Sequence, residues 1–207
     1  MEYVKLNNDV KMPQLGLGTF QSNDAALCEQ TILEALWQGY RLIDTAQGYG
    51  NEKYIGNALA KTDVPREELF IVTKVWFKNY EDCRQSVLRS MEDLRVDYLD
   101  LVLLHWPFGN TYRAWRDLEA LYTDPALTAI AQKHGKTSRQ VALRYQLQLG
   151  IVIIPKTVSP DRLKENIGVF DFELTAGDMQ TLSRMDKAQP LIGNPQNPAL
   201  VEMSAQW

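Results

Sequence analysis

Three apolar segments recur in the first half of the chain at intervals of roughly 30 residues, and a polar side chain follows each of them. The segments start near residues 41, 69 and 99. This spacing is the size of one strand–helix repeat, in which consecutive strands run parallel and the crossover is right-handed. The recurrence therefore predicts a parallel α/β protein, either a barrel or a layered sheet.

The residues before and between these segments complete the pattern. Residues 3–12 alternate around a turn-prone cluster and predict a β-hairpin, and 15–20 predict a strand. A helix is expected from the cap at 22–24 to Gly39, a second over about 52–60, and a third that carries Val87, Leu88, Met91 and Leu94 on one face. The segment that leads to His105 is almost continuously apolar, so we expect a fully buried parallel strand there.

The regular interval of about 30 residues between predicted strands ends after His105. Helical patterns follow one another before the next strand, at 151–155, arrives, and two short helices then start at the caps Ser159 and Thr175. These patterns cover residues 111–122, 126–134 and 137–149. The stretch Thr123–Pro125 is either a helix boundary or a junction where a segment has been lost.

Composition excludes several classes of protein. The chain has 207 residues, 45% of them hydrophobic and 23% charged, which is enough for a folded core and argues against disorder. A formal net charge of −4 and a pI near 5.3 argue against nucleic acid as a partner. Cys28 and Cys83 fall on apolar helix faces and indicate reduced thiols in the core. With no leader or apolar span visible, we expect a soluble, cytoplasmic protein without membrane partners.

The glycines of the strand at 15–20 do not form a dinucleotide-binding fingerprint. Gly16 and Gly18 are spaced for the start of GxGxxG, but Gln21 stands where the third glycine is needed. A Rossmann fold is therefore not favoured.

Polar side chains end three successive strands. Asp44, Lys74 and His105 take these positions, and Tyr49 lies one short Gly-rich turn beyond Asp44. Because catalytic residues of parallel α/β barrels project from the carboxyl ends of the strands, their shared placement predicts a site. Each of the three also has a structural alternative when it is considered alone. Asp44 could cap the following turn, Lys74 could be an ordinary lysine at a strand end, and His105 could be a hydrogen-bonded histidine of the core.

These four side chains suit proton donation to a carbonyl group. A lysine ammonium close to Tyr49 is expected to lower the phenol pKa from its usual value near 10. Asp44 would hold Lys74 in place, and His105 could donate a hydrogen bond that orients the carbonyl oxygen.

With these motifs, the chain resembles the aldo-keto reductases, and within them the bacterial branch of 2,5-diketogluconate and glyoxal reductases. The resemblance rests on GLGTF at 16–20, LIDTAQGYGNE at 42–52, LVLLHWP at 101–107 and IPKTVSPDRLKEN at 154–166. It implies a (β/α)8 TIM barrel with an N-terminal hairpin, a nicotinamide cofactor, and Asp44, Tyr49, Lys74 and His105 as the catalytic tetrad with Tyr49 as general acid. It also implies a carbonyl pocket walled by Phe20, Trp76 and Trp106, although core packing is an equal alternative for Phe20.

The chemistry of the motif KTVSPDRLKEN also indicates a phosphate site, independently of the resemblance. Lys156, Arg162 and a helix start at Ser159–Pro160 combine cations with backbone donors, as a phosphate group requires, although a solvated basic turn is the alternative. Because arginine accepts a 2′-phosphate, NADPH is favoured over NADH. The resemblance assigns this role to Lys156, Thr157, Arg162 and Asn166.

Part of the family barrel has no counterpart in the sequence. About five of the eight strands can be recognised in a single domain over 1–207, with a probable deletion junction near 122–125. The missing part includes the residues that hold the nicotinamide. Two functions follow: an NADPH-dependent reductase of small aldehydes, α-dicarbonyls or keto-sugars, or a weakly active remnant that oligomerises or binds a partner through unpaired strand edges. A complete barrel would be a monomer.

Overall fold

The computed structural model describes residues 1–105 and 125–185. The predicted helix over 111–122, the pocket residue Trp106 and the tail after 185 lie outside these ranges. The chain divides into two compact units, which are described separately. The first holds residues 1–105 and 149–170, and the described part of the second holds 125–148 and 171–185. The single-domain assignment stays a prediction.

The chain begins with the predicted hairpin. Strands β1 (Tyr3–Lys5) and β2 (Lys11–Pro13) pair antiparallel, with Val4 opposite Met12. Asp9 takes a left-handed backbone conformation at φ 66° in the turn between them.

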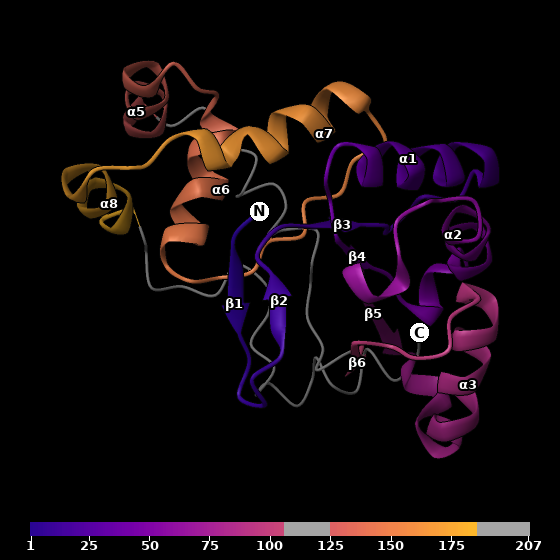
Figure 1. Ribbon diagram of the computed structural model, residues 1–207. Helices are drawn as coiled ribbons and strands as arrows, with labels where there is room; N and C mark the ends of the chain where they lie inside the picture. Colours follow the sequence, from indigo (N-terminus) through magenta and orange to yellow (C-terminus); the bar gives the residue numbers. More distant parts are fainter. Residues whose placement is uncertain (106–124, 186–207) are drawn as a thin grey trace. The chain divides into compact units, whose positions relative to one another are not determined.

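A parallel sheet is the centre of the first unit (Figure 1). Its strands pair in sequence order, as the 30-residue recurrence predicts: β3 (Gly16–Gly18), β4 (Leu42–Asp44), β5 (Phe70–Val75) and β6 (Leu101–Leu104). A fifth segment, residues 153–156, lies parallel to β3 through the bridges Leu15–Ile153 and Gly18–Lys156. Gly18 permits this approach, because a Cβ there would come within 2.8 Å of the Ile154 carbonyl oxygen.

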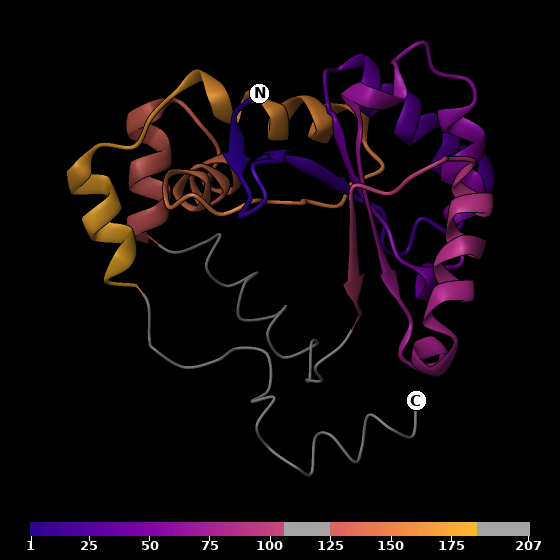
Figure 2. The same cartoon turned by 60° about the horizontal axis from the view of Figure 1, so that its bottom comes forward.

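Helices α1 (Ala25–Trp37), α2 (Glu52–Leu59) and α3 (Cys83–Leu94) lie side by side along the sheet (Figures 1 and 2). Asp24 caps α1 by accepting a hydrogen bond from the Leu27 amide at 2.8 Å. Helix α7 (Pro160–Ile167) packs against α1. Short 3-10 turns join these elements: η1 (Gln47–Tyr49), η2 (Arg66–Glu68), η3 (Phe77–Asp82) and η4 (Gly168–Asp171).

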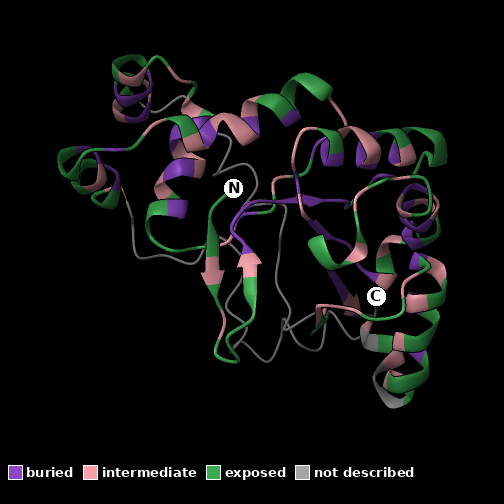
Figure 3. Ribbon diagram, in the orientation of Figure 1, coloured by how far each residue is buried: buried purple, intermediate pink, exposed green. Residues whose placement is uncertain are grey.

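The core of the first unit consists of the apolar side chains that the strands and helices were expected to bury (Figure 3). Among them are Leu17, Ile43, Ile71, Cys28, Ile32 and Leu36. Cys83, expected in a core, is only half-buried at the start of α3. Among the described residues, no helix is long and apolar enough to cross a membrane.

Strand β6 is not the fully buried strand that its apolar sequence predicted. Val102 is 38% exposed and Leu104 is 63% exposed. The physical reason is its position, since β5 is the only described strand that pairs with β6, so that β6 is an edge. The apolar run was correct for a central strand of a complete barrel and wrong for this one.

The described part of the second unit is helical. It contains α5 (Pro125–His134), α6 (Ser138–Gln148) and α8 (Ala176–Ser183), close to the predicted bounds. Its core is formed by Leu127, Ile130, Ala131, Val141, Leu174 and Leu182.

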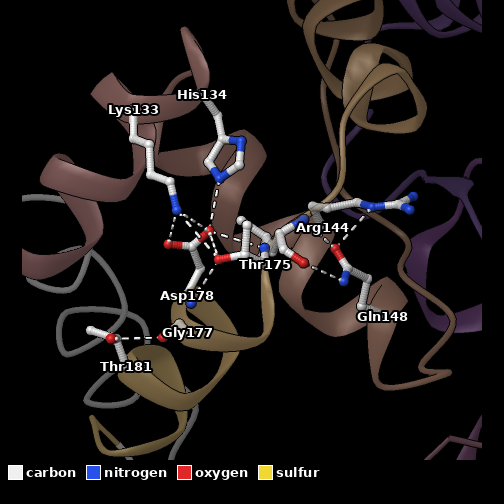
Figure 4. A network of polar contacts seen from close by, with 9 residues as sticks. Lys133, His134, Arg144, Gln148, Thr175, Gly177, Asp178 and Thr181 are labelled. Carbon is white, nitrogen blue, oxygen red and sulfur yellow. Dashed lines mark hydrogen bonds and ion pairs between the residues drawn. The ribbon is translucent and has the colours of Figure 1, made fainter.

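Asp178 joins α8 to the end of α5 in this unit (Figure 4). Its carboxylate accepts hydrogen bonds from the Thr175 amide at 3.0 Å and from Lys133 Nζ at 2.9 Å, and His134 Nε2 lies 2.9 Å from it. Burial alone would raise the pKa of Asp178, but the bonds from His134, Thr175 and Lys133 hold it well below its usual range.

We expect Asp178→Asn to lower the free energy of unfolding by about 2 kcal/mol at pH 7, because hydrogen bonds to a charged acceptor are lost. Since the folded-state pKa is depressed, this contribution is present above the unfolded pKa of about 4 and disappears as the pH falls below it. Urea denaturation at pH 7 and at low pH measures both. The exposed Asp63→Asn is the control, and an equal loss in both variants would contradict the assignment.

Candidate active site

The carboxyl ends of three neighbouring strands bring the predicted polar residues together. Asp44 is the last residue of β4, Lys74 lies near the end of β5, and His105 directly follows β6. Tyr49 closes the turn η1, which follows β4 and ends at Gly50 with φ 66°. Because the strands are parallel and in register, all four side chains lie at the same end of the sheet, where the strands have their carboxyl ends.

Asp44 and Lys74 form a buried ion pair. Lys74 Nζ lies 2.6 Å from Asp44 Oδ1 and donates a second bond to the Thr45 carbonyl at 2.9 Å. Only 13% of the Lys74 side chain and 7% of the Asp44 side chain are exposed. Burial raises the pKa of Asp44, and the neighbouring ammonium opposes that rise. The pair holds the ammonium in place beside Tyr49.

The expected lowering of the Tyr49 pKa is wrong. Lys74 Nζ lies 5.3 Å from the centre of the Tyr49 ring, but burial and then the Asp44 carboxylate raise the pKa of Tyr49 to about 12. Asp44 compensates the charge of Lys74, so the ammonium does not outweigh desolvation. Tyr49 is therefore a protonated phenol at neutral pH, which is the form that can donate a proton.

His105 lies edge-on to two aromatic rings. Its ring centre is 5.3 Å from that of Tyr49 and 5.0 Å from that of Trp76. Burial, and then the positive charge of Lys74, lower the pKa of His105 to about 4. The imidazole is thus neutral at physiological pH and has one N–H to donate to a neighbouring oxygen.

We expect His105 to titrate with a midpoint near pH 4 in NMR spectra of the ring protons. The chain has 2 histidines, so His134→Asn identifies the His105 signal directly. Since the folded-state pKa lies below the unfolded value of about 6.5, the neutral ring favours folding above that pH, and this is lost as the pH falls toward 4. A midpoint at or above 6 would contradict the described surroundings of this ring.

Two of the three predicted pocket aromatics lie beside the four polar residues. The Phe20 ring centre is 5.0 Å from that of Tyr49, and Phe20 is 54% exposed, so the core-packing alternative is wrong. Trp76 contacts His105, and Gly48 makes room for it, because a Cβ at Gly48 would lie 2.5 Å from the indole. The site therefore has aromatic walls on at least two sides.

Sequence reasoning missed Gln47, which anchors the turn that carries Tyr49. Its side-chain oxygen accepts bonds from the Trp76 amide at 3.0 Å and from Ser86 Oγ at 2.7 Å. Its amide nitrogen donates to Ser90 Oγ at 3.0 Å. The only signal was its position between Asp44 and Tyr49, because a lone glutamine in a polar turn looks like solvated surface.

A second buried network of hydrogen bonds fixes the strands that carry the site. Asn51 donates to the Thr19 carbonyl at 2.8 Å and accepts from Thr45 Oγ1 at 3.1 Å. Glu52 accepts a bond from Thr73 Oγ1 at 2.6 Å, and burial raises its pKa. These bonds fix the ends of β4 and β5 to the start of α2, so the positions of Asp44 and Lys74 are determined by the fold.

Three residues of the predicted phosphate site, Lys156, Thr157 and Arg162, lie around the start of α7, and Asn166 lies near its end. Lys156 and Arg162 are exposed, whereas Thr157 and Asn166 are buried. Ser159 takes the N-cap position, but its side chain bonds none of the described amides of the first turn. An exposed pair of cations and the amides of a helix start are the donors that a phosphate binds.

A surface cavity lies at the opposite end of the strands. It has a volume of about 520 Å³ and is lined by Arg41, Phe70 and Asp100, which stand at the amino ends of β4, β5 and β6. None of the four clustered polar residues contributes to it.

Comparison with known proteins identifies the family of this chain. The sequence model of the Aldo/keto reductase family matches residues 14–124 and 119–187. The chain belongs to the aldo/keto reductase family. It is 33% identical to the glyoxal reductase of Bacillus subtilis (strain 168), over 93% of this chain and 95% of that protein. It is 31% identical to the 9,11-endoperoxide prostaglandin H2 reductase of Trypanosoma cruzi (strain CL Brener), over 94% and 95%.

Solved structures of aldo-keto reductases share the fold. The enzyme MGS-M4 from a Medee basin deep-sea metagenome library has a TM-score of 0.85 and 28% identity, over 94% of this chain and 98% of that one. A protein from Brucella melitensis has a TM-score of 0.80 and 29% identity, over 89% and 98%. The predicted barrel of the aldo-keto reductases is thus confirmed, as is its incompleteness.

This aldo/keto reductase is shorter than its relatives within the aligned region. The alignment with the Bacillus protein has 263 columns but uses 93% of 207 residues, so about 70 columns are gaps in this chain. The two stretches matched by the family overlap at residues 119–124. A junction near 122–125 stays a prediction, and family membership places the chain among oxidoreductases that act on carbonyl compounds.

Proposed function

We propose that this protein reduces small aldehydes, α-dicarbonyls or keto-sugars to alcohols with NADPH as reductant. The observation that carries the proposal is the cluster of Asp44, Lys74, Tyr49 and His105 at one edge of the sheet. A buried ion pair beside a protonated phenol and a neutral imidazole suits a reaction that places a proton on a carbonyl oxygen.

Each residue has a distinct part in this mechanism. Tyr49 donates its phenolic proton to the carbonyl oxygen as negative charge develops there, and the Lys74 ammonium stabilises the phenolate that remains. Asp44 holds Lys74 at 2.6 Å, and His105 donates a hydrogen bond to the same carbonyl oxygen. The Phe20 and Trp76 rings lie beside Tyr49 and His105 and would contact the substrate.

The cofactor would be held at its phosphate end by Lys156, Arg162 and the start of α7. These residues fit a 2′-phosphate, because they offer exposed cations and backbone donors at one point. When bound, NADPH supplies the hydride. The residues that would enclose the nicotinamide have no recognised counterpart in the sequence, so we propose weaker cofactor binding than in a complete barrel.

The direct test is oxidation of NADPH in the presence of methylglyoxal, followed at 340 nm. We expect saturable turnover that depends on both compounds. Quenching of tryptophan fluorescence by NADPH, measured in parallel, separates binding from chemistry. Saturable quenching without turnover would reject the reductase, and the absence of both would reject the cofactor site as well.

We expect Arg162→Ala to weaken NADPH binding about tenfold and to leave NADH binding unchanged, because only NADPH carries the 2′-phosphate. Fluorescence titration with both cofactors measures this. Lys164→Ala is the matched control, since Lys164 is another exposed cation of α7. Equal weakening of NADPH and NADH would show that Arg162 does not contact the 2′-phosphate.

A further inference from the structure

Gln47 uses both ends of its side-chain amide within the fold. The amide nitrogen donates to the Ser86 carbonyl at 2.9 Å and to Ser90 Oγ at 3.0 Å. The oxygen accepts from the Trp76 amide at 3.0 Å, from Asn79 Nδ2 at 3.1 Å and from Ser86 Oγ at 2.7 Å. Because the Ser86 carbonyl can only accept and the Trp76 amide can only donate, one orientation of the Gln47 amide satisfies both.

This side chain joins two parts of the candidate site. Gln47 begins the turn η1, which ends at Tyr49, and it binds the main chain at Trp76, directly after β5. The Trp76 indole also packs against the turn, because a Cβ at Gly48 would lie 2.5 Å from the indole. Tyr49 and Trp76 are thus connected both by the Gln47 side chain and by the main chain at Gly48.

His105 contacts both of these parts. Its ring centre is 5.3 Å from that of Tyr49 and 5.0 Å from that of Trp76, and it meets both rings edge-on. A shift of the turn relative to Trp76 would therefore change the surroundings of His105. The five hydrogen bonds of Gln47 go to other residues, so its effect on the site is indirect.

Gln47 also continues the buried network that holds β5. Ser90 Oγ donates to Glu52 at 3.1 Å, and Glu52 accepts from Thr73 Oγ1 at 2.6 Å, one residue before Lys74. The hydrogen bonds thus run from η1 through α3 and α2 to the strand that carries Lys74. Removing one member of such a network leaves buried partners unsatisfied.

We infer that Gln47 is a positioning residue for the reduction, because it sets the place of the Tyr49 hydroxyl relative to the Trp76 ring. The effect on rate rests on the proposed function, whereas the effect on geometry rests on the contacts alone. Misplacing a reacting group by about 1 Å can lower a rate roughly 10²-fold. The cofactor phosphate residues lie on another segment, around α7, so Gln47 acts on kcat and not on NADPH affinity.

Gln47→Met tests the inference, because methionine keeps the length of the side chain and makes none of the five hydrogen bonds. We expect kcat for methylglyoxal to fall about 10- to 100-fold, and the Kd of NADPH to stay within a factor of about two. Gln148→Met is the matched control, since Gln148 also bonds a main-chain amide and carbonyl, those of Leu174 in the second unit. It should change neither value. Circular dichroism establishes that each variant is folded.

Combining Gln47→Met with Tyr49→Phe distinguishes positioning from a general loss of structure. If Gln47 acts through the phenol, the double variant has the kcat of Tyr49→Phe alone, within a factor of about two. Losses that multiply would show that Gln47 acts on another group, and would overturn the inference.

NMR spectra of the His105 ring protons test the geometry without turnover. The ring currents of Tyr49 and Trp76 shift these signals, so we expect them to move in Gln47→Met and in Gly48→Ala, which displaces the indole directly, but not in Gln148→Met. A wild-type protein without turnover would reject the proposed reduction and leave this measurement to decide the geometry. Unchanged His105 signals in folded Gln47→Met overturn the inference, as does an unchanged kcat when the wild type is active.

Discussion

Tyr49→Phe is expected to lower kcat for methylglyoxal reduction by about 10²–10⁴-fold, the range that one general acid contributes. The substitution removes the phenolic oxygen alone. The ring keeps its contacts with Phe20 and His105, whose centres lie 5.0 and 5.3 Å away, so the site keeps its shape. Steady-state oxidation of NADPH measures the loss.

The matched control for this variant is Tyr98→Phe. Tyr98 is 43% exposed and lies beside Arg66, whose guanidinium carbon is 3.9 Å from its ring centre. We expect its activity to stay within a factor of about two of the wild type, consistent with a surface substitution. NADPH affinity should be unchanged in both variants. Activity in Tyr49→Phe equal to that of Tyr98→Phe would show that another group donates the proton.

The grouping of the site residues could be predicted because it follows from topology. Once strands of about 30-residue spacing are recognised as parallel, their carboxyl ends must meet at one edge. Asp44, Lys74 and His105 each follow an apolar run, and the structure brings them together with Tyr49. The apolar pattern and the spacing of the strands were therefore sufficient to predict that these side chains lie close together.

The properties that depend on surroundings could not be predicted in the same way. The pKa of Tyr49 rises to about 12 because burial and Asp44 outweigh Lys74, and the sequence gives no measure of burial at a turn. The exposure of β6 depends on which strands lie beside it, and its apolar sequence is that of a central strand. Gln47 was missed because its four partners come from η3, α3 and the end of β5.

Lys74→Met is expected to lower the free energy of unfolding by about 3–5 kcal/mol, because it leaves the Asp44 carboxylate buried without its counter-ion. The two side chains are 13% and 7% exposed, so water cannot replace the lost ammonium. Urea denaturation at pH 7 measures the loss. Lys61→Met is the control, since its ion pair with Glu29 involves a lysine side chain that is 58% exposed, and we expect a much smaller loss there because water replaces the ammonium.

Adding Asp44→Asn to Lys74→Met should restore most of the lost stability, because the buried charge is then removed. Reductase activity should stay absent in both variants, so the effect on stability can be distinguished from the effect on catalysis. In Lys74→Met alone, burial still raises the pKa of Asp44 above its unfolded value, and the opposing ammonium is gone. A group with a raised folded-state pKa destabilises the fold when ionised, so this variant should gain stability as the pH falls through that pKa. If the single and double variants lost equal stability at every pH, the loss would have to come from the contacts of the lysine chain and not from a stranded carboxylate.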